Sequence, residues 1–211
     1  MKYILIVMLL LTSVTANDFD KGLDAVQQGD YTTALKFWKP LAEQGDANTQ
    51  YNLGVMYDDG KGVAQDFKQA VAWYTRAAKQ GYADAQYNLG SMYKDGQGVM
   101  QDFKQAVAWY TRAADQGVAD AQYNLGLMYN DGKGVAQDSK QAATWYTRAA
   151  KQGHADAQLN LGVMYYKGQG VTKDKIEAYT WLLKAAKQGH SMAQNNLDIL
   201  CKQSPWACQQ R

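Results

Sequence analysis

The sequence lacks the features that mark a disordered chain, a nucleic-acid-binding protein or a protein with several membrane spans. Only 2 of its 211 residues are proline and 46% are hydrophobic, which argues against disorder. The formal net charge is +2, too small for a domain that gathers lysine and arginine on one face for nucleic acid. After the first sixteen residues no apolar stretch approaches the length of a membrane span. We therefore expect a folded mature chain with no nucleic-acid partner and no membrane span.

The first sixteen residues have the pattern of a secretory signal peptide. Lys2 supplies the positive charge, residues 4–11 form an apolar run, and Val14-Thr15-Ala16 matches a small-residue cleavage site. The apolar run is too short to cross a bilayer as a stable helix, although an uncleaved anchor helix is the alternative. We predict a signal peptide over residues 1–16 and an exported chain, either periplasmic or secreted.

A four-residue motif recurs at a fixed interval along the chain. Tyr51-Asn52-Leu53-Gly54 returns as Tyr87-Asn88-Leu89-Gly90 and Tyr123-Asn124-Leu125-Gly126, with looser copies at 159–162 and 195–198. Consecutive copies lie 36 residues apart. Self-similarity at such a period is typical of a solenoid, in which each repeat packs only against its neighbours. The sequence therefore predicts an extended binding surface rather than one buried pocket.

Each repeat carries the signals of two helices, which we name helix A and helix B in chain order. In the second repeat, residues 83–95 form an apolar stripe at helical spacing, and Gly96 follows it as a stop signal. Asp102 is the predicted N-cap of helix B, with Gln105 three residues on and Gly117 as its C′ residue. The same signals in every repeat predict an all-α fold built from 36-residue helix pairs.

The domain boundaries follow from this register. We predict an N-terminal capping helix pair over 17–45 and a C-terminal capping helix with a tail over 191–211. The stretch 46–190 between them holds four repeats, at about 47–82, 83–118, 119–154 and 155–190.

Glycine stands in the middle of helix A, where it costs about 1 kcal/mol relative to alanine. A repeated cost needs a repeated reason, and the simplest is that helix B approaches too closely for a side chain. The residues concerned are Gly54, Gly90, Gly126 and Gly162. In the last copy this position is Asp198, where no helix B follows.

The two cysteines, Cys201 and Cys208, lie close together in the tail. An exported chain can oxidise such a pair, so we predict a disulfide there. The spacing is not the C-x-x-C of a reactive dithiol, which indicates a structural staple. We expect it to hold Trp206 across the open end of the core.

The repeat resembles that of the Sel-one-like family, which is related to the tetratricopeptide type. The resemblance covers about residues 20–200 and rests on the pattern A-D-A-Q-Y-N-L-G-x-M-Y-x-D-G-x-G-V, continued by a Q-D-x-K-Q-A-x-x-W-Y-x-R-A-A-x-Q-G segment. It implies a right-handed α/α solenoid of antiparallel helix pairs that scaffolds protein–protein interactions. Some cysteine-rich members have been described as β-lactam-binding or β-lactamase proteins. This chain lacks their cysteine pair in every repeat and keeps only the terminal pair.

Candidate catalytic and metal-binding residues lack the partners that their chemistry requires. Ser91 and Lys94 match the S-x-x-K of serine β-lactamases, but neither S-D-N nor K-T-G accompanies them. His154 and His190 are the only histidines and occupy the turn position that Tyr82 holds in another repeat. We expect no metal-ligating or general-base partner beside either histidine. The sequence therefore predicts no catalytic residue, no metal and no cofactor.

The face of helix A that points away from helix B is the predicted partner surface. Positions that vary between copies while staying exposed are free to select partners. They form a tyrosine row, an apolar row and a mixed polar margin, and exposed tyrosine suits protein binding. The predicted residues are Asn48, Tyr51, Val55, Asp58, Asp84, Tyr87, Ser91, Lys94, Asp120, Tyr123, Leu127, Asn130, Asp156, Leu159, Val163 and Tyr166. The alternative is that the tyrosines pack against the next helix A.

The predicted function is an exported, non-enzymatic scaffold that binds a protein or peptide through its concave helix-A surface. The alternative, implied by the cysteine-rich relatives, is β-lactam or cell-wall-related binding or hydrolysis. A third hypothesis is a spacer that self-associates through its open repeat ends. The partner itself has no signature in the sequence.

Overall fold

The structure is a computed structural model that describes residues 18–209. Over this range the chain is helical and contains no β-strand. The predicted signal peptide, residues 1–16, lies outside the described residues. The chain divides into two compact units, the first ending at Gln101 and the second beginning at Asp102. Each unit is described by itself.

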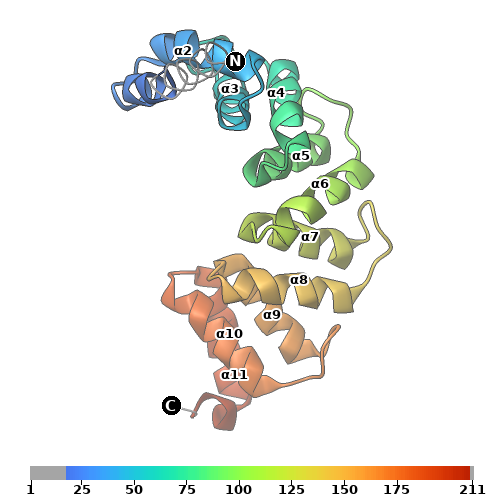
Figure 1. Cartoon of the computed structure of the whole chain (residues 1–211). Helices are drawn as coiled ribbons and strands as arrows, with labels where there is room; N and C mark the ends of the chain where they lie inside the picture. Colours follow the sequence, from blue (N-terminus) through green and yellow to red (C-terminus); the bar gives the residue numbers. More distant parts are fainter. Residues whose placement is uncertain (1–17, 210–211) are drawn as a thin grey trace, which may run out of the picture. The chain divides into compact units, whose positions relative to one another are not determined.

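The first unit begins with helical residues 18–27 and continues with four helices of thirteen residues each. These helices are α2 (Tyr31–Glu43), α3 (Ala47–Asp59), α4 (Phe67–Lys79) and α5 (Ala83–Asp95) (Figure 1). Each helix packs against the next along the chain. A core cluster forms around Trp38, Leu53 and Trp73, which are buried. α3 and α5 are helices A, whereas α2 and α4 are helices B.

The second unit follows the same alternation and ends in a short 3-10 helix. Its elements are α6 (Phe103–Asp115), α7 (Ala119–Asp131), α8 (Ser139–Lys151), α9 (Ala155–Lys167), α10 (Lys175–Lys187), α11 (Ser191–Gln203) and η1 (Pro205–Cys208) (Figure 1). Its core includes one cluster around Tyr146 and Leu161 and another around Leu182 and Leu197. α7, α9 and α11 are helices A, and α11 packs directly against α9.

The helix ends lie where the sequence predicts them. The carboxylate of Asp102 accepts hydrogen bonds from the backbone N–H groups of Lys104 and Gln105, which confirms the predicted N-cap of α6. Gly96 ends α5 in the left-handed conformation, with φ of 72°. Gly117 follows α6 at φ of 94°. Because glycine adopts these angles without steric cost, the two residues stop their helices where the repeat requires.

The mid-helix glycines face helix B at very short range. A Cβ added to Gly126 would lie 2.6 Å from the ring of Tyr146, and one added to Gly54 would lie 2.4 Å from the ring of Tyr74. In the last full repeat Gly162 faces Leu182 instead, at 2.8 Å from its Cγ. The expected close approach of helix B is therefore confirmed at these three glycines.

The tail folds back over α11 and is held by the predicted disulfide. Cys201 and Cys208 are bonded, with Cα atoms 5.6 Å apart. The prediction that Trp206 covers the core is wrong, because its side chain is 57% exposed. The 3-10 turn directs Ala207 inward instead, where it is fully buried. Ala207 therefore takes the buried position of the turn, and Trp206 takes an exposed one.

Candidate binding surface

The predicted partner residues lie on the helices A, four on each of α3, α5, α7 and α9. We call their surface the helix-A wall and describe it unit by unit. The predicted residue in the first turn of each of these helices is exposed. The other predicted residues are partly buried, except Leu159, which is buried. The exposed residues are Asn48, Asp84, Asp120 and Asp156. The wall thus presents side chains that solvent reaches, although most of them also contact the fold.

The tyrosine row is packed on one side. The Tyr51 ring stacks on Tyr82, the residue before α5, with centroids 4.9 Å apart. In the second unit the Tyr123 ring stacks on His154, the residue before α9, at 4.5 Å. Burial raises the pKa of both Tyr51 and Tyr123 above the usual phenol value. These tyrosines therefore support the next repeat and offer only their outer edge to a partner.

Leu159 departs from the pattern expected for the wall. It stands where the other repeats have tyrosine, but it is only 7% exposed and belongs to the core cluster of α10 and α11. An aliphatic side chain lacks the hydroxyl that holds tyrosine at the water boundary, so it sinks into the core. Leu159 is consequently removed from the set of residues that a partner can reach.

The polar margin differs from repeat to repeat. The Tyr74 hydroxyl donates a 3.2 Å hydrogen bond to the Asp58 carboxylate in the first unit. Burial raises the pKa of Asp58, and the bond from Tyr74 opposes that shift. One repeat later Lys94 pairs with Asp95 at 3.4 Å. The margin therefore changes its charge along the chain while the helices beneath keep their positions.

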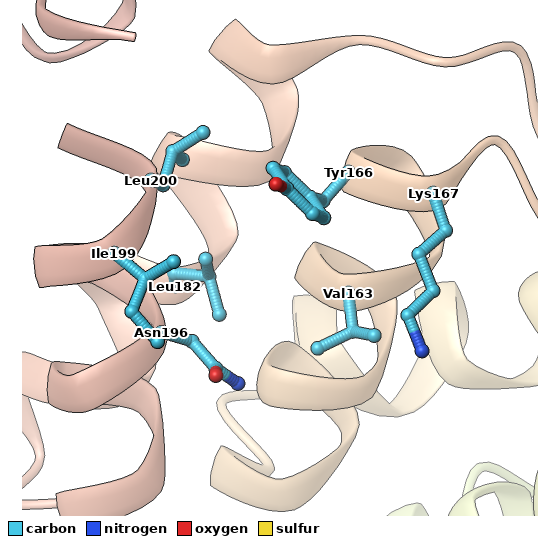
Figure 2. A pocket seen from close by; sticks show the side chains of 7 residues that line it. All are labelled: Val163, Tyr166, Lys167, Leu182, Asn196, Ile199 and Leu200. Carbon is cyan, nitrogen blue, oxygen red and sulfur yellow. The ribbon is translucent and has the colours of Figure 1, made fainter. Parts of the chain in front are cut away.

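Two hollows open on the wall of the second unit. The polar hollow, about 270 Å³, is lined by Leu127, Asn130, Tyr146, Asn160, Val163, Met164, Lys167 and Gln169. The apolar hollow, about 250 Å³, is lined by Val163, Tyr166, Lys167, Leu182, Asn196, Ile199 and Leu200. Figure 2 shows α9 contributing Val163 and Lys167 on one side of the apolar hollow and α11 contributing Ile199 on the other. Four predicted wall residues, Leu127, Asn130, Val163 and Tyr166, line the hollows.

The asparagine that follows the wall tyrosine is a residue that the sequence argument missed. Asn88 hydrogen-bonds to Tyr51 and Tyr74, and Asn160 to Tyr123 and Tyr146. This asparagine is identical in every copy, so a search for positions that vary between repeats passes over it. Its polar side chain on the same face as the variable residues was the available signal.

The histidines have partners that were not expected. The Nε2 atom of His154 lies 3.2 Å from an Asp120 carboxylate oxygen, and that of His190 lies 2.9 Å from Asp156. The Nδ1 atom of His154 also accepts a hydrogen bond from the Ala157 N–H. The expectation that adjacent turns offer the histidines no partner is wrong, because the solenoid places the first turn of one helix A beside the start of the next.

The described residues provide no cluster for a metal ion. Between residues 18 and 209, no group of three or more histidine, cysteine, aspartate or glutamate side chains is placed to hold one. Each histidine meets a single carboxylate, and the arrangement is a pair across two repeats. Over the same residues no helix is long and apolar enough to span a membrane.

Comparison with solved structures places this fold among several repeat proteins. The protective antigen c5321 of uropathogenic Escherichia coli, which displays an SLR fold, is 36% identical with a TM-score of 0.88. The match covers 91% of this chain and 42% of that one. A Sel1 repeat protein from Oxalobacter formigenes is 44% identical with a TM-score of 0.74, over 80% of this chain and 49% of that one. The chain therefore spans less than half the length of either relative.

A cysteine-rich relative is also similar. Cysteine-rich protein B of Helicobacter pylori is 28% identical with a TM-score of 0.50, over 63% of this chain and 96% of that one. The family model described as Sel1 repeat matches residues 19–46, 47–82, 83–118, 119–154 and 155–190. These five matches run almost without a break through the helix pairs of both units. The chain belongs to the Sel1 repeat family, as an α/α solenoid of 36-residue helix pairs.

Proposed function

We propose that this chain is an exported, non-enzymatic scaffold that binds a protein or peptide through the helix-A wall, the concave side of an α/α solenoid. Sel1 repeat proteins are generally protein-interaction scaffolds and are generally not catalysts.

One observation carries the choice of surface. On the helix-A wall the partly exposed positions change chemistry from repeat to repeat, while the residues beneath them stay constant. Val55, Ser91, Leu127 and Val163 share one position, and Asp58, Lys94, Asn130 and Tyr166 share another. The buried residues are enough to hold the fold together. Accessible positions that vary between repeats are therefore free to select a partner. The two hollows on this wall support the same choice.

The binding proposal can be tested by crosslinking capture from the exported fraction of the source cells. The wild-type chain is compared with a wall variant, Leu127→Asp with Val163→Asp, and with an outer-face variant, Ala72→Asp with Ala108→Asp. Both alanines are exposed on helices B, so their substitution leaves the wall intact. We expect a partner band with the wild type and the outer-face variant and none with the wall variant. Equal capture by all three, with circular dichroism showing folded chains, would remove the wall as the binding surface.

Export has its own test. The pattern of residues 1–16 and the disulfide between Cys201 and Cys208 both suit an oxidising compartment. That the relative c5321 is a protective antigen is consistent with a location outside the cytoplasm. N-terminal sequencing of the chain from the exported fraction should begin at Asn17. A chain recovered only from the cytoplasm, with Met1 retained, would contradict export.

A further inference from the structure

The two hollows are the same site in successive repeats. Moving the polar hollow forward by 36 residues carries six of its lining residues onto lining residues of the apolar hollow. The corresponding pairs are Leu127 and Val163, Asn130 and Tyr166, Tyr146 and Leu182, Asn160 and Asn196, Val163 and Ile199, and Met164 and Leu200. A site that recurs with the repeat is suited to successive side chains of one extended ligand.

Two of the corresponding pairs change chemistry between the hollows: Asn130 is replaced by Tyr166, and Tyr146 by Leu182. Leu182 stands where Tyr74, Tyr110 and Tyr146 stand in the other repeats. In the polar hollow the tyrosine supplies a hydroxyl, and burial raises the pKa of Tyr146 so that it stays protonated. In the apolar hollow Leu182 has no hydroxyl and is narrower than a tyrosine ring. The lining becomes largely aliphatic, with Leu182 and Leu200 buried and Ile199 51% exposed.

Lys167 lies at the rim of both hollows and is positively charged at a position that is acidic in the other repeats. The equivalent residues are acidic, and each forms a salt bridge with a nearby lysine: Asp59 with Lys61, Asp95 with Lys94, and Asp131 with Lys133. Lys167 has no salt-bridge partner within residues 18–209. The side chains beside it in the polar hollow are the amides of Asn130, Asn160 and Gln169. A free cation surrounded by amides is a setting that favours a carboxylate.

We propose that this part of the wall binds an extended peptide segment of the partner that carries a bulky aliphatic residue and an acidic residue. The aliphatic side chain occupies the apolar hollow, where it is covered by Val163 and Ile199. The acidic side chain lies at Lys167 and reaches the amides of the polar hollow. This inference rests on the proposed function, because it assigns the ligand chemistry of the same wall.

The spacing between the two ligand residues follows from the repeat. Helices that pack against each other, as α9 and α11 do, have axes about 10 Å apart. An extended chain advances about 3.3 Å per residue. The two side chains are therefore separated by about three residues. Neither direction of the peptide is favoured by the lining residues, so both orders belong in the test.

The test uses fluorescein-labelled ten-residue peptides of glycine and serine with one leucine and one glutamate three positions apart, in both orders. Binding to the full mature chain is measured by fluorescence anisotropy. We expect saturable binding of at least one of the two orders. Replacing the peptide leucine by alanine or its glutamate by glutamine should weaken binding about tenfold, as loss of an apolar anchor or a charge-assisted contact does.

Two protein variants restore what the other repeats contain and are therefore expected to fold. Lys167→Asp places the residue of positions 59, 95 and 131, and Leu182→Tyr that of positions 74, 110 and 146. Lys167→Asp should abolish the preference for the glutamate peptide over the glutamine peptide. Leu182→Tyr should weaken binding of the leucine peptide about tenfold, because the ring fills the hollow. Lys187→Asp is the matched control: Lys187 is exposed, and one of its equivalents in the other repeats is Asp115. The control should bind as the wild type does.

The outcomes separate this inference from the proposed function. Any of three outcomes would overturn the inference. No peptide binds saturably, or replacing the peptide glutamate by glutamine leaves the affinity unchanged, or Lys167→Asp and Lys187→Asp weaken binding equally. If Lys167→Asp and Leu182→Tyr still capture the partner while the wall variant does not, the wall function stands and the ligand chemistry falls. If the wall variant itself captures the partner, the proposed function falls as well.

Discussion

The side-chain amide of Gln188 donates a 2.8 Å hydrogen bond to the Oε1 atom of Gln158, thirty residues earlier in the chain. Gln158 in turn donates to the backbone carbonyl of Ala150, and Gln188 also donates to that of Gly153. Gln50 with Gln80 and Gln122 with Gln152 form the same clasp in other repeats. The clasp ties the start of helix A to the ends of the helices B before and after it, so it fixes the register of neighbouring repeats.

We predict that Gln158→Leu destabilises the chain by about 1–3 kcal/mol, because Gln158 is buried and its loss leaves the Ala150 carbonyl without this donor. Gln188→Ala should cost less, about 1 kcal/mol, since Gln188 is exposed and water replaces the amide. Urea unfolding monitored by circular dichroism gives both values. A Gln158→Leu variant as stable as the wild type would mean that the clasp contributes nothing to the free energy of unfolding.

The close contact between Gly126 and the Tyr146 ring gives a second prediction. Gly126→Ala should destabilise the chain, because the new Cβ would lie 2.6 Å from the ring and overpacking costs about 1–3 kcal/mol. The better helix propensity of alanine offsets about 1 kcal/mol of this. The loss should vanish in a Tyr146→Ala background, where the ring is absent. A net gain in stability from Gly126→Ala alone would show that helix B can move away without cost.

The sequence allowed the prediction of everything that depends on local spacing. The caps Asp66, Asp102, Asp138 and Asp174 and the terminating glycines are short-range signals, and the structure has the helix ends at these residues. The crowding at Gly126 was predictable too, because an unfavourable residue repeated in one place points to a steric reason.

Contacts between repeats were not predictable from the sequence, since they depend on how one helix pair lies on the next. The Gln158–Gln188 clasp joins positions that are identical in most copies, and comparison of the copies does not indicate which residues such positions contact. The burial of Leu159 depends on the core of α10 and α11, and the exposure of Trp206 on the geometry of the 3-10 turn. The hollows arise where Leu182 and Lys167 depart from the repeat, and their shape requires the coordinates.

His154 is predicted to stabilise the start of α9 in two ways that can be separated. Its Nδ1 atom accepts from the Ala157 N–H, and its ring stacks on Tyr123. His154→Ala loses both contacts and should cost about 1–2 kcal/mol. His154→Tyr should cost less, because it can reproduce the stack that Tyr82 makes on Tyr51 and loses only the cap and the contact with Asp120. Chemical denaturation compares the three chains, and equal losses for both variants would mean that the stack adds no stability.

The half-buried carboxyl of Asp58 predicts a specific dependence of stability on pH. Burial raises its pKa in the folded chain above the ordinary value of 3.8, so just above pH 3.8 the folded state binds more protons than the unfolded state. This group therefore makes stability fall as pH rises through that window, and at neutral pH its ionised form disfavours the folded state. Asp58→Asn should have a higher Tm than the wild type at pH 7, since the amide carries no charge and its oxygen still accepts from Tyr74. The equivalent position holds Asn130 in another repeat, so the substitution suits the fold.

The difference in Tm between Asp58→Asn and the wild type should shrink as pH falls from 7 toward about 4, because a raised pKa makes the wild-type carboxyl take up its proton earlier in the folded chain than in the unfolded chain. Thermal melts between pH 4 and pH 7 measure it, with Asp20→Asn as a control at an exposed carboxyl. A difference that stays constant over this range would contradict a raised pKa. A variant less stable than the wild type at pH 7 would show that the bond from Tyr74 to the carboxylate outweighs the burial of its charge. That bond would then be a reason for an aspartate at this point of the wall.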